Sequence, residues 1–398
     1  MAESKEMRGS SAHINNSLDY SVSVPTKLSI AIITRRFGAR FGGAEAYAEN
    51  LTRELIKNHN VRVFCQEFDS QVEVASTLIP RLRLARWLNQ LWFNLYCHVL
   101  TRKGYDIVHS HENSWVGNVQ VVHVMPVRFS LFRHKRSLLR QLSVFASPRL
   151  LTYLVLERFR FRMRPNCILV VPAQQTLDQL RAVYRNLPAT VIIHPGVTLP
   201  SNTPERDVAL ASLGLDTTAI YCLLVANDPL RKGLATILRA METLDDRFHL
   251  IVLGGDAACH AGLRAHIPAA LASRVHTYPA RTDVGLFYAC GDLYLHPTLQ
   301  DSFGMAPLEA MSYGMPVIIS SKEYCGFSAC VEAGSDALVV VDPRDASELA
   351  LAIHRISHDP VLRATLCANG FALARRFEWR AVEQKFIKTY TEVLAGGA

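Results

Sequence analysis

The residues best suited to chemistry lie in one stretch of the C-terminal half, HPTLQDSFGMAPLEAMSYGMPVI, which begins at His296. Two carboxylates stand eight positions apart in it, Asp301 and Glu309, with Gly304 between them. The pattern predicts a strand end, a turn at the glycine and then a helix. Because the first turn of a helix has free N–H groups, the backbone there can face a ligand.

Glu309 is the carboxylate with the more informative neighbours. Leu308, Ala310 and Met311 surround it, and a carboxylate in so apolar a stretch usually has a specific partner. A ribose diol, with two hydroxyl donors, would be a natural one. Two alternatives stay open: Asp301 can be a loop or helix-capping acid, and Glu309 can be a solvated helix residue.

A second candidate is the basic pair Arg231 and Lys232, which follows one predicted strand and precedes a predicted helix. Ligands of open α/β sheets bind at this carboxyl edge. Two cations there suit a diphosphate, since arginine offers a planar fork and lysine a point charge. Taken alone, an exposed basic pair is more often a solvated helix start.

Gly42 and Gly43 occupy the same kind of position in the N-terminal half, between a predicted buried strand and a helix start. Bare backbone can approach a ligand there, and the N–H groups of the helix favour an anion. The same pair can also form a tight turn without a ligand.

These residues need strand-to-helix turns to position them, and the apolar pattern predicts two series of such turns. Residues 28–34 form a nearly continuous apolar run, which is typical of a strand buried on both faces of a parallel sheet. Helix and strand then alternate through the N-terminal half. Strands are expected at 28–34, 61–65, 106–109, 119–124, 167–171 and 190–193, and helices at 44–59, 88–99 and 149–164.

The alternation restarts after a polar stretch at 200–207, which predicts a linker. Strands are expected at 221–226, 249–253, 293–296 and 316–320, and helices at 234–244, 306–313 and 379–394. Two doubly wound units fit this order better than one sheet. We therefore predict an α/β protein of two Rossmann-like domains, 27–199 and 208–375, which face each other across a cleft and are followed by a C-terminal crossover helix over 376–398.

The composition is that of a globular protein without a membrane span. The chain has 398 residues, 49% of them hydrophobic and 20% charged, and no apolar run approaches the roughly 20 residues that a span needs. Residues 1–26 lack the apolar core of a secretory signal, so we expect a disordered leader. The nine cysteines show neither CxxC pairing nor histidine partners at zinc spacing, which indicates reduced thiols in a cytoplasm and no metal site.

The net charge of +8 is concentrated in one segment. From Arg128 to Arg164 the chain holds ten Lys or Arg against one acid, Glu157, and interleaves them with Phe and Leu. Such a mixture suits an anionic membrane surface, where each basic side chain adds about 1 kcal/mol. An ordinary solvated helix face is the alternative. Nucleic acid is disfavoured as a partner, because no zinc finger, helix-turn-helix or RNA-binding aromatic signature accompanies the charge.

Taken together, these motifs resemble those of glycosyltransferase family 4, which has the GT-B fold, and the resemblance covers nearly the whole chain after residue 26. The matching motifs are a first glycine loop at Phe41-Gly42-Gly43, an interdomain turn at Pro195-Gly196-Val197, a phosphate-binding loop at Arg231-Lys232-Gly233 and a paired-acid motif from Asp301 to Glu309. Within the family, the sequences of these motifs are most similar to those of bacterial lipopolysaccharide core α-1,3-glucosyltransferases. One position departs from the pattern: the first acid is usually Glu and is Asp301 here.

The resemblance implies roles for the matching residues. Glu309 would bind the nucleotide ribose, and Arg231 and Lys232 would bind the diphosphate. Gly42 and Gly43 would face that diphosphate across the cleft.

The donor sugar and the catalytic groups are implied in the same way. The sugar would contact the side chain of Asp301 and the backbone of Phe303, Gly304, Met305 and Ala306. Arg281, in the loop 279–281, would lie beside the nucleobase. The residues implied for catalysis are Asp301, His123, Lys232 and Arg231. Three further residues lie near strand ends on the acceptor side, where a single histidine is more often structural: Asp106, His109 and His111.

Similarity to this family implies retention of configuration at the anomeric carbon, without a metal or other cofactor. The sequence agrees, since no Asp-x-Asp follows a predicted strand and two cations can stabilise a leaving diphosphate. The implied reaction moves a hexose from UDP to a cell-surface glycan such as lipopolysaccharide core, at the inner face of the cytoplasmic membrane. The resemblance to the glucosyltransferases implies that this hexose is glucose. The alternatives are hexosyl transfer from a GDP- or ADP-sugar for exopolysaccharide assembly, a nucleotide-sugar epimerase, and a non-catalytic nucleotide-sugar-binding protein.

Overall fold

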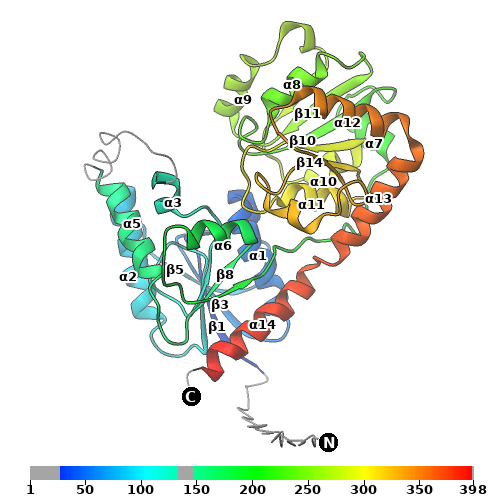
Figure 1. The fold of residues 1–398 in the computed structure, drawn as a ribbon. Helices are drawn as coiled ribbons and strands as arrows, with labels where there is room; N and C mark the ends of the chain where they lie inside the picture. The colour runs from blue at the N-terminus through cyan, green and yellow to red at the C-terminus, as the bar shows by residue number, and fades with distance from the viewer. Residues whose placement is uncertain (1–26, 133–146, 397–398) are drawn as a thin grey trace, which may run out of the picture.

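The computed structural model describes residues 27–132 and 147–396. The leader expected over 1–26 and the middle of the basic segment, 133–146, lie outside the described residues. The described chain forms two lobes, each built on a parallel sheet with helices around it (Figure 1). This confirms the predicted pair of Rossmann-like domains.

The N-terminal sheet has seven strands in the order β5-β3-β1-β6-β7-β8-β9. They are β1 (Ser29–Ile33), β3 (Asn60–Cys65), β5 (Ala75–Leu78), β6 (Ile107–Ser110), β7 (Val119–Val121), β8 (Ile168–Val171) and β9 (Ala189–Ile192). A second, two-stranded pair joins β2 (Arg36–Phe37) to β4 (Glu67–Phe68). The helices of this lobe are α1 (Gly43–Leu55), α2 (Arg86–Leu100), α3 (Val127–Phe132), α5 (Pro148–Arg160) and α6 (Gln174–Arg181).

The C-terminal sheet has six strands in the order β12-β11-β10-β13-β14-β15. They are β10 (Ile220–Val225), β11 (Phe248–Leu253), β12 (Val275–Tyr278), β13 (Leu293–His296), β14 (Val317–Ser320) and β15 (Leu338–Val340). Its helices are α7 (Arg206–Ser212), α8 (Leu234–Met241), α9 (Ala257–Arg264), α10 (Val284–Cys290), α11 (Met305–Ser312), α12 (Ala346–His358) and α13 (Pro360–Arg375). Helix α7 begins inside the stretch predicted as a linker, and its first residue, Arg206, pairs with Asp292 of this lobe at 2.8 Å.

Both sheets have the doubly wound strand order, in which the chain winds outward in one direction and then in the other. The order reverses beside the first strand of each sheet, between β1 and β6 in one lobe and between β10 and β13 in the other. Ligands of such sheets bind outside the carboxyl ends of the strands at this reversal point. The topology therefore marks one candidate crevice in each lobe.

The last helix, α14 (Trp379–Ala395), returns to the N-terminal lobe, as the sequence predicted (Figure 1). Its residues Trp379, Phe386 and Tyr390 are buried in the hydrophobic cluster that contains β1, β3 and the inner face of α1. The rings of Trp379 and Tyr47 meet edge to face at 5.1 Å. Where the chain crosses between the lobes, Val197 N–H donates to the carbonyl of Phe377 at 2.7 Å. The two connections between the lobes, before α7 and before α14, therefore lie side by side.

Candidate functional site

The reversal point of the C-terminal sheet brings together the basic pair and the first acid of the paired-acid motif. Lys232 follows β10, and Asp301 follows β13, the neighbouring strand. The Lys232 ammonium and the Asp301 carboxylate form an ion pair in which the side chains are only 12% and 19% exposed. His296, the last residue of β13, lies 3.0 Å from the same carboxylate through Nε2. The structure thus brings the basic pair and Asp301, which the sequence placed separately after predicted strands, to one edge of the sheet.

Asp301 is held in its charged form by these two partners. Burial acts to raise its pKa, but the hydrogen bond from His296 and the positive charge of Lys232 outweigh burial and hold the pKa well below its ordinary value. Burial lowers the pKa of His296, so its ring is neutral near pH 7 and its Nε2–H donates to Asp301. The arrangement presents one lysine charge at the carboxyl edge of the sheet, oriented by a fixed carboxylate.

Arg231 lies on the surface of the same crevice. Its guanidinium, half-exposed, donates to the carbonyl of Gln300 at 3.0 Å and pairs with Asp228 at 3.2 Å. It therefore ties the loop after β10 to the loop that carries Asp301. An arginine in this position can turn one face toward a ligand without breaking a buried contact.

The paired-acid motif forms the turn and helix that the sequence predicted. Gly304 has a left-handed φ of 108°, and a Cβ there would lie 2.7 Å from Cys325 Sγ, so both the backbone and the space require glycine. Helix α11 starts directly after it, which leaves the N–H groups of Met305 and Ala306 at the helix N-terminus. Phe303 is 3% exposed and its ring packs in the core, so only its backbone is available to a ligand.

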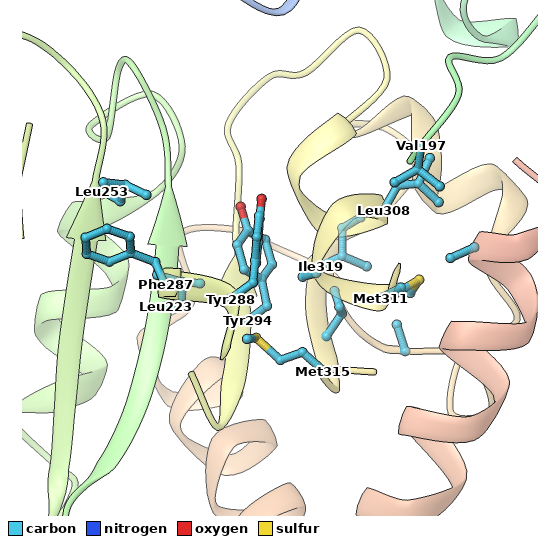
Figure 2. Packing of buried hydrophobic residues seen from close by; sticks show 14 of the residues in the cluster. Val197, Leu223, Leu253, Phe287, Tyr288, Tyr294, Leu308, Met311, Met315 and Ile319 are labelled. Atoms are coloured by element: carbon cyan, nitrogen blue, oxygen red, sulfur yellow. The ribbon is translucent and has the colours of Figure 1, made fainter. Parts of the chain in front are cut away.

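Glu309 is a partly buried residue of α11 with one protein partner. Its carboxylate accepts a hydrogen bond from the Tyr288 hydroxyl at 2.8 Å. Burial raises the pKa of Glu309, against the opposing effect of that hydrogen bond. Leu308 and Met311 of the same helix point into the core, and Tyr288 stands beside Tyr294 next to it (Figure 2). The alternative of a solvated Glu309 is therefore wrong.

The structure does not bring Arg281 into contact with the other predicted site residues. It follows β12, the edge strand, and its guanidinium pairs with Asp283 at 2.6 Å and lies over the Phe287 ring. The loop is exposed and lies beyond the strand next to β10. A base would have to extend along this edge to reach it.

The N-terminal lobe presents a glycine turn and a histidine stack at its own reversal point. Gly42 has a φ of 146° and precedes α1, and Gly43 opens that helix. His109 lies on β6 and His111 directly follows that strand, and their rings stack at 4.5 Å. His111 Nδ1 then contacts Nε2 of His123 at 2.8 Å, beyond the end of β7.

The three histidines are neutral. Burial is the main cause that lowers the pKa of both His109 and His123 to about 3, and the positive charge of Arg160 contributes for His123. Burial also holds the pKa of His111 well below its ordinary value. His109 Nδ1 contacts the Tyr390 hydroxyl at 2.6 Å, so it acts as a structural residue, as the sequence favoured. Asp106 is structural too, because its carboxylate accepts from the N–H of Ser29 at 2.7 Å.

The two lobes meet where these crevices face each other. Gln300, the residue before Asp301, contacts Met125, two positions after His123, at 3.5 Å between Nε2 and Sδ. Met305 at the start of α11 packs against the core clusters of both lobes. The loop that carries His123 and the loop that carries Asp301 therefore lie against each other.

Three contributors to this site were missed in the sequence. His296 stood at a predicted strand end, which was a usable signal. Tyr288, the partner of Glu309, lies 21 positions away on α10 and carries no motif. His194 stacks on Phe303 at 5.4 Å, and its Nε2 contacts Cys330 Sγ at 3.7 Å.

One group of side chains in the described residues has the spacing of metal ligands. Ligand atoms of His296, Asp301 and Cys325 lie within 4.8 Å of one another. Burial raises the pKa of the Cys325 thiol to about 12, and that thiol donates to the carbonyl of Phe303 at 3.0 Å. Since Lys232 already supplies a positive charge to Asp301, the group is a poor fit for a metal cation.

Comparison with protein families matches both lobes. The model described as Glycosyltransferase Family 4 matches residues 41–199, and the model described as Glycosyl transferases group 1 matches residues 219–359. A D-inositol 3-phosphate glycosyltransferase of Actinosynnema mirum is 30% identical over 229 residues, 54% of this chain and 54% of that protein. One of Catenulispora acidiphila is 27% identical over 245 residues, 58% of each. The match thus spans little more than half the length of these relatives.

Solved structures with the same fold cover nearly the whole chain. WaaG, a glycosyltransferase involved in lipopolysaccharide biosynthesis, has a TM-score of 0.77 at 20% identity, over 91% of this chain and 99% of its own. Anabaena HepE in complex with UDP-glucose has a TM-score of 0.72 at 18% identity, over 92% of this chain and 100% of its own. At these identities, the likeness establishes the GT-B fold.

Proposed function

We propose that the chain is a glycosyltransferase that moves a hexose from a nucleotide sugar to a glycan acceptor, since the family 4 model matches residues 41–199 and the group 1 model matches residues 219–359. The observation that carries the proposal is the Lys232–Asp301 pair beside the free N-terminus of α11, opposite the loop of His123. A cation, amide donors and a second lobe are what a diphosphate-sugar needs.

In this proposal, the C-terminal lobe binds the donor. Lys232 and Arg231 contact the diphosphate, and the N-terminus of α1 at Gly42 and Gly43 faces it from the other lobe. Glu309 accepts hydrogen bonds from the ribose hydroxyls. The other carboxylate oxygen, Oε1, accepts no hydrogen bond from the described residues, so a ribose hydroxyl can reach it without displacing the tyrosine.

The donor sugar contacts Asp301 and the N–H groups between Phe303 and Ala306. Lys232 stabilises the charge that develops on the leaving diphosphate, which removes the need for a divalent metal. The neutral His123, whose Nε2 is engaged by His111, has its Nδ1 left to contact the sugar or the acceptor. The nucleobase lies toward the edge strand, near Arg281.

The proposed transfer retains the anomeric configuration, as the resemblance to family 4 implies. The proposed donor is UDP-glucose and the proposed acceptor a lipopolysaccharide-core-like glycan. Two proteins of known structure with this fold support this choice: one is in complex with UDP-glucose, and one is involved in lipopolysaccharide biosynthesis. The curated relatives, named for D-inositol 3-phosphate, favour a second candidate, a small phosphorylated polyol acceptor.

We also propose that the N-terminal lobe docks on an anionic membrane surface, as the segment from Arg128 to Arg164 suggested. No helix of the described residues is long and apolar enough to span a bilayer. On α5, however, Leu151, Val155 and Phe159 recur every four residues and are 43%, 42% and 47% exposed. The exposed Arg158 lies on the same helix. An apolar stripe flanked by cations suits the interface of anionic lipids.

Vesicle sedimentation tests the docking proposal. Wild-type protein should bind anionic vesicles better than neutral ones at low salt, and Leu151→Ser/Phe159→Ser should reduce that binding. Val361→Ser, which removes an exposed apolar side chain from the other lobe, is the control. Equal binding to anionic and neutral vesicles would refute it.

Donor turnover with and without acceptor tests the catalytic proposal. NMR of UDP-glucose incubated with the enzyme and a panel of truncated core glycans and inositol phosphates should show acceptor-dependent loss of donor and a product with the donor's α configuration. An epimerase would convert the donor without acceptor, and a binding protein would leave it intact.

A further inference from the structure

A hollow opens at the carboxyl edge of the N-terminal sheet, apart from the residues assigned above. Its volume is about 810 Å³, within the range of small-molecule sites. Six arginines line it with a single carboxylate, Glu67, and we call it the arginine hollow. The lining residues are Arg35, Arg36, Gln66, Glu67, Arg81, Leu82, Arg83, Leu84, Arg86, Asn89, Arg149 and Tyr153.

Only half of these arginines have acid partners among the described residues. Arg35 pairs with Glu112 at 3.0 Å, Arg36 with Glu45 at 2.6 Å, and Arg81 with Glu67 at 3.2 Å. The other three, Arg83, Arg86 and Arg149, form no ion pair with a described carboxylate; Arg149 lies over the Tyr153 ring at 5.7 Å. Three uncompensated cations around one hollow favour an anion with several charged oxygens.

The arginine hollow adjoins the histidine stack through one side chain. Glu112 follows His111 directly and accepts both the N–H and the Nε–H of Arg35, at 2.8 Å and 3.0 Å. His111 in turn contacts His123, whose loop lies against the loop of Asp301. An acceptor that extends from the His123 loop toward β1 would therefore bring its far end into the hollow.

We propose that the arginine hollow binds phosphate groups on the acceptor, and that Arg83, Arg86 and Arg149 are the residues that recognise them. This role rests on the proposed transfer reaction, and it narrows the acceptor to a phosphorylated saccharide or polyol. A phosphate monoester or diphosphate can engage two or three guanidinium forks at once, whereas a single carboxylate satisfies only one. The apolar Leu82 and Leu84 and the Tyr153 ring supply a surface for the ring that bears the phosphate.

Calorimetric titration of the full chain with pyrophosphate tests the site. Because Lys232 offers a second place for a diphosphate, the titration is made in the Lys232→Ala protein. Binding should persist there and weaken by about tenfold or more when Arg83→Gln/Arg86→Gln is added, since two charge-assisted contacts are lost. Arg102→Gln/Arg185→Gln, at exposed arginines on the opposite edge of the sheet, is the matched control and should leave the affinity unchanged.

The source of the phosphate is distinguished by two further probes. Glucose 6-phosphate, compared with glucose, represents a free phosphorylated sugar, and vesicles containing lipid A, compared with vesicles without it, represent a lipid-linked one. Arginine-dependent binding in either arm supports the proposal and identifies the source. Pyrophosphate binding that vanishes with Lys232→Ala, or that is unchanged by Arg83→Gln/Arg86→Gln, overturns it. UDP binding by the Arg83→Gln/Arg86→Gln protein distinguishes failure of the phosphate-site proposal from failure of the transferase proposal. If UDP still binds, the transferase proposal stands even where the arginine hollow is shown not to bind phosphate.

Discussion

Substitution of Lys232 should show how much the buried ion pair with Asp301 contributes to the free energy of unfolding and how much it contributes to donor binding. The Lys232→Met substitution leaves Asp301 charged, 19% exposed and supported only by His296. Breaking a buried pair by removing one partner costs about 3–5 kcal/mol, and the remaining exposure of both side chains reduces this to about 2–3 kcal/mol. The double variant Lys232→Met/Asp301→Asn has no stranded charge, so it should recover most of that loss.

Unfolding has to be followed in the correct lobe. All four tryptophans lie on N-terminal-lobe elements, on α2, on α14 and before β7, so tryptophan fluorescence reports that lobe. Amide hydrogen exchange of β10 and β13 in urea reports the C-terminal lobe. Both variants should lose donor nucleotide binding, because both lack the cation.

The result that would refute this reasoning is a double variant no more stable than Lys232→Met. The loss would then come from packing of the lysine stem and not from an uncompensated carboxylate. A single variant as stable as the wild type would show instead that solvent screens Asp301 fully. Donor binding retained in the single variant would remove Lys232 from the diphosphate site.

Three further predictions concern the same region. Folding lowers the pKa of Asp301, so the contribution of this carboxylate to stability should be constant above about pH 4 and should disappear as the pH falls through the folded pKa. In urea unfolding, the difference in free energy of unfolding between the wild type and Asp301→Asn should therefore narrow only in acid. Since burial lowers the pKa of His123 to about 3, the transfer rate should show no inflection from this residue between about pH 5 and 8, and an inflection that His123→Ala abolishes would contradict the buried, neutral ring. In thermal unfolding, Gly304→Ala should destabilise the protein by about 2 kcal/mol and Gly314→Ala by about 1 kcal/mol. Both glycines have a positive φ, but only a Cβ at position 304 would press on Cys325. Equal losses of stability would mean that the cysteine moves aside.

The elements that sequence could predict are those buried on both faces. β1 and β10 are continuous apolar runs at the centre of their sheets, and the sequence placed both. The edge strand β5 was missed because its four residues, ASTL, are mostly exposed and show no apolar pattern. Its existence depends on pairing with β3, which no local signal reveals.

The candidate site was predictable as far as it depends on strand ends. Lys232 and Asp301 each follow a strand, and parallel topology brings the ends of neighbouring strands to one edge. Their direct pairing, across 69 positions, depends on β13 lying next to β10, which sequence order does not specify. The same holds for the histidine stack, since His123 meets His111 only because β7 pairs with β6.

The arginine hollow could not be found in the sequence. Arg81, Arg83 and Arg86 come from an irregular segment and the start of α2, whereas Arg149 begins α5 more than sixty positions later. Nothing in their spacing forms a motif, and only Arg149 lies in the basic segment to which the sequence directed attention. These side chains come to line one hollow only through the fold of the N-terminal lobe.

The most direct test of the central claim is calorimetric titration of the wild-type chain with UDP, GDP and ADP in EDTA, repeated with Lys232→Ala and Glu309→Ala. The proposal predicts micromolar binding of UDP without metal, loss of that binding in Lys232→Ala, and about a hundredfold loss in Glu309→Ala, which removes the ribose hydrogen bonds. Tyr288→Phe, which removes the protein partner of Glu309 but keeps its carboxylate, is the matched control and should retain UDP. Absence of binding by every nucleotide, or binding that survives in both Lys232→Ala and Glu309→Ala, would contradict the assignment of the donor site.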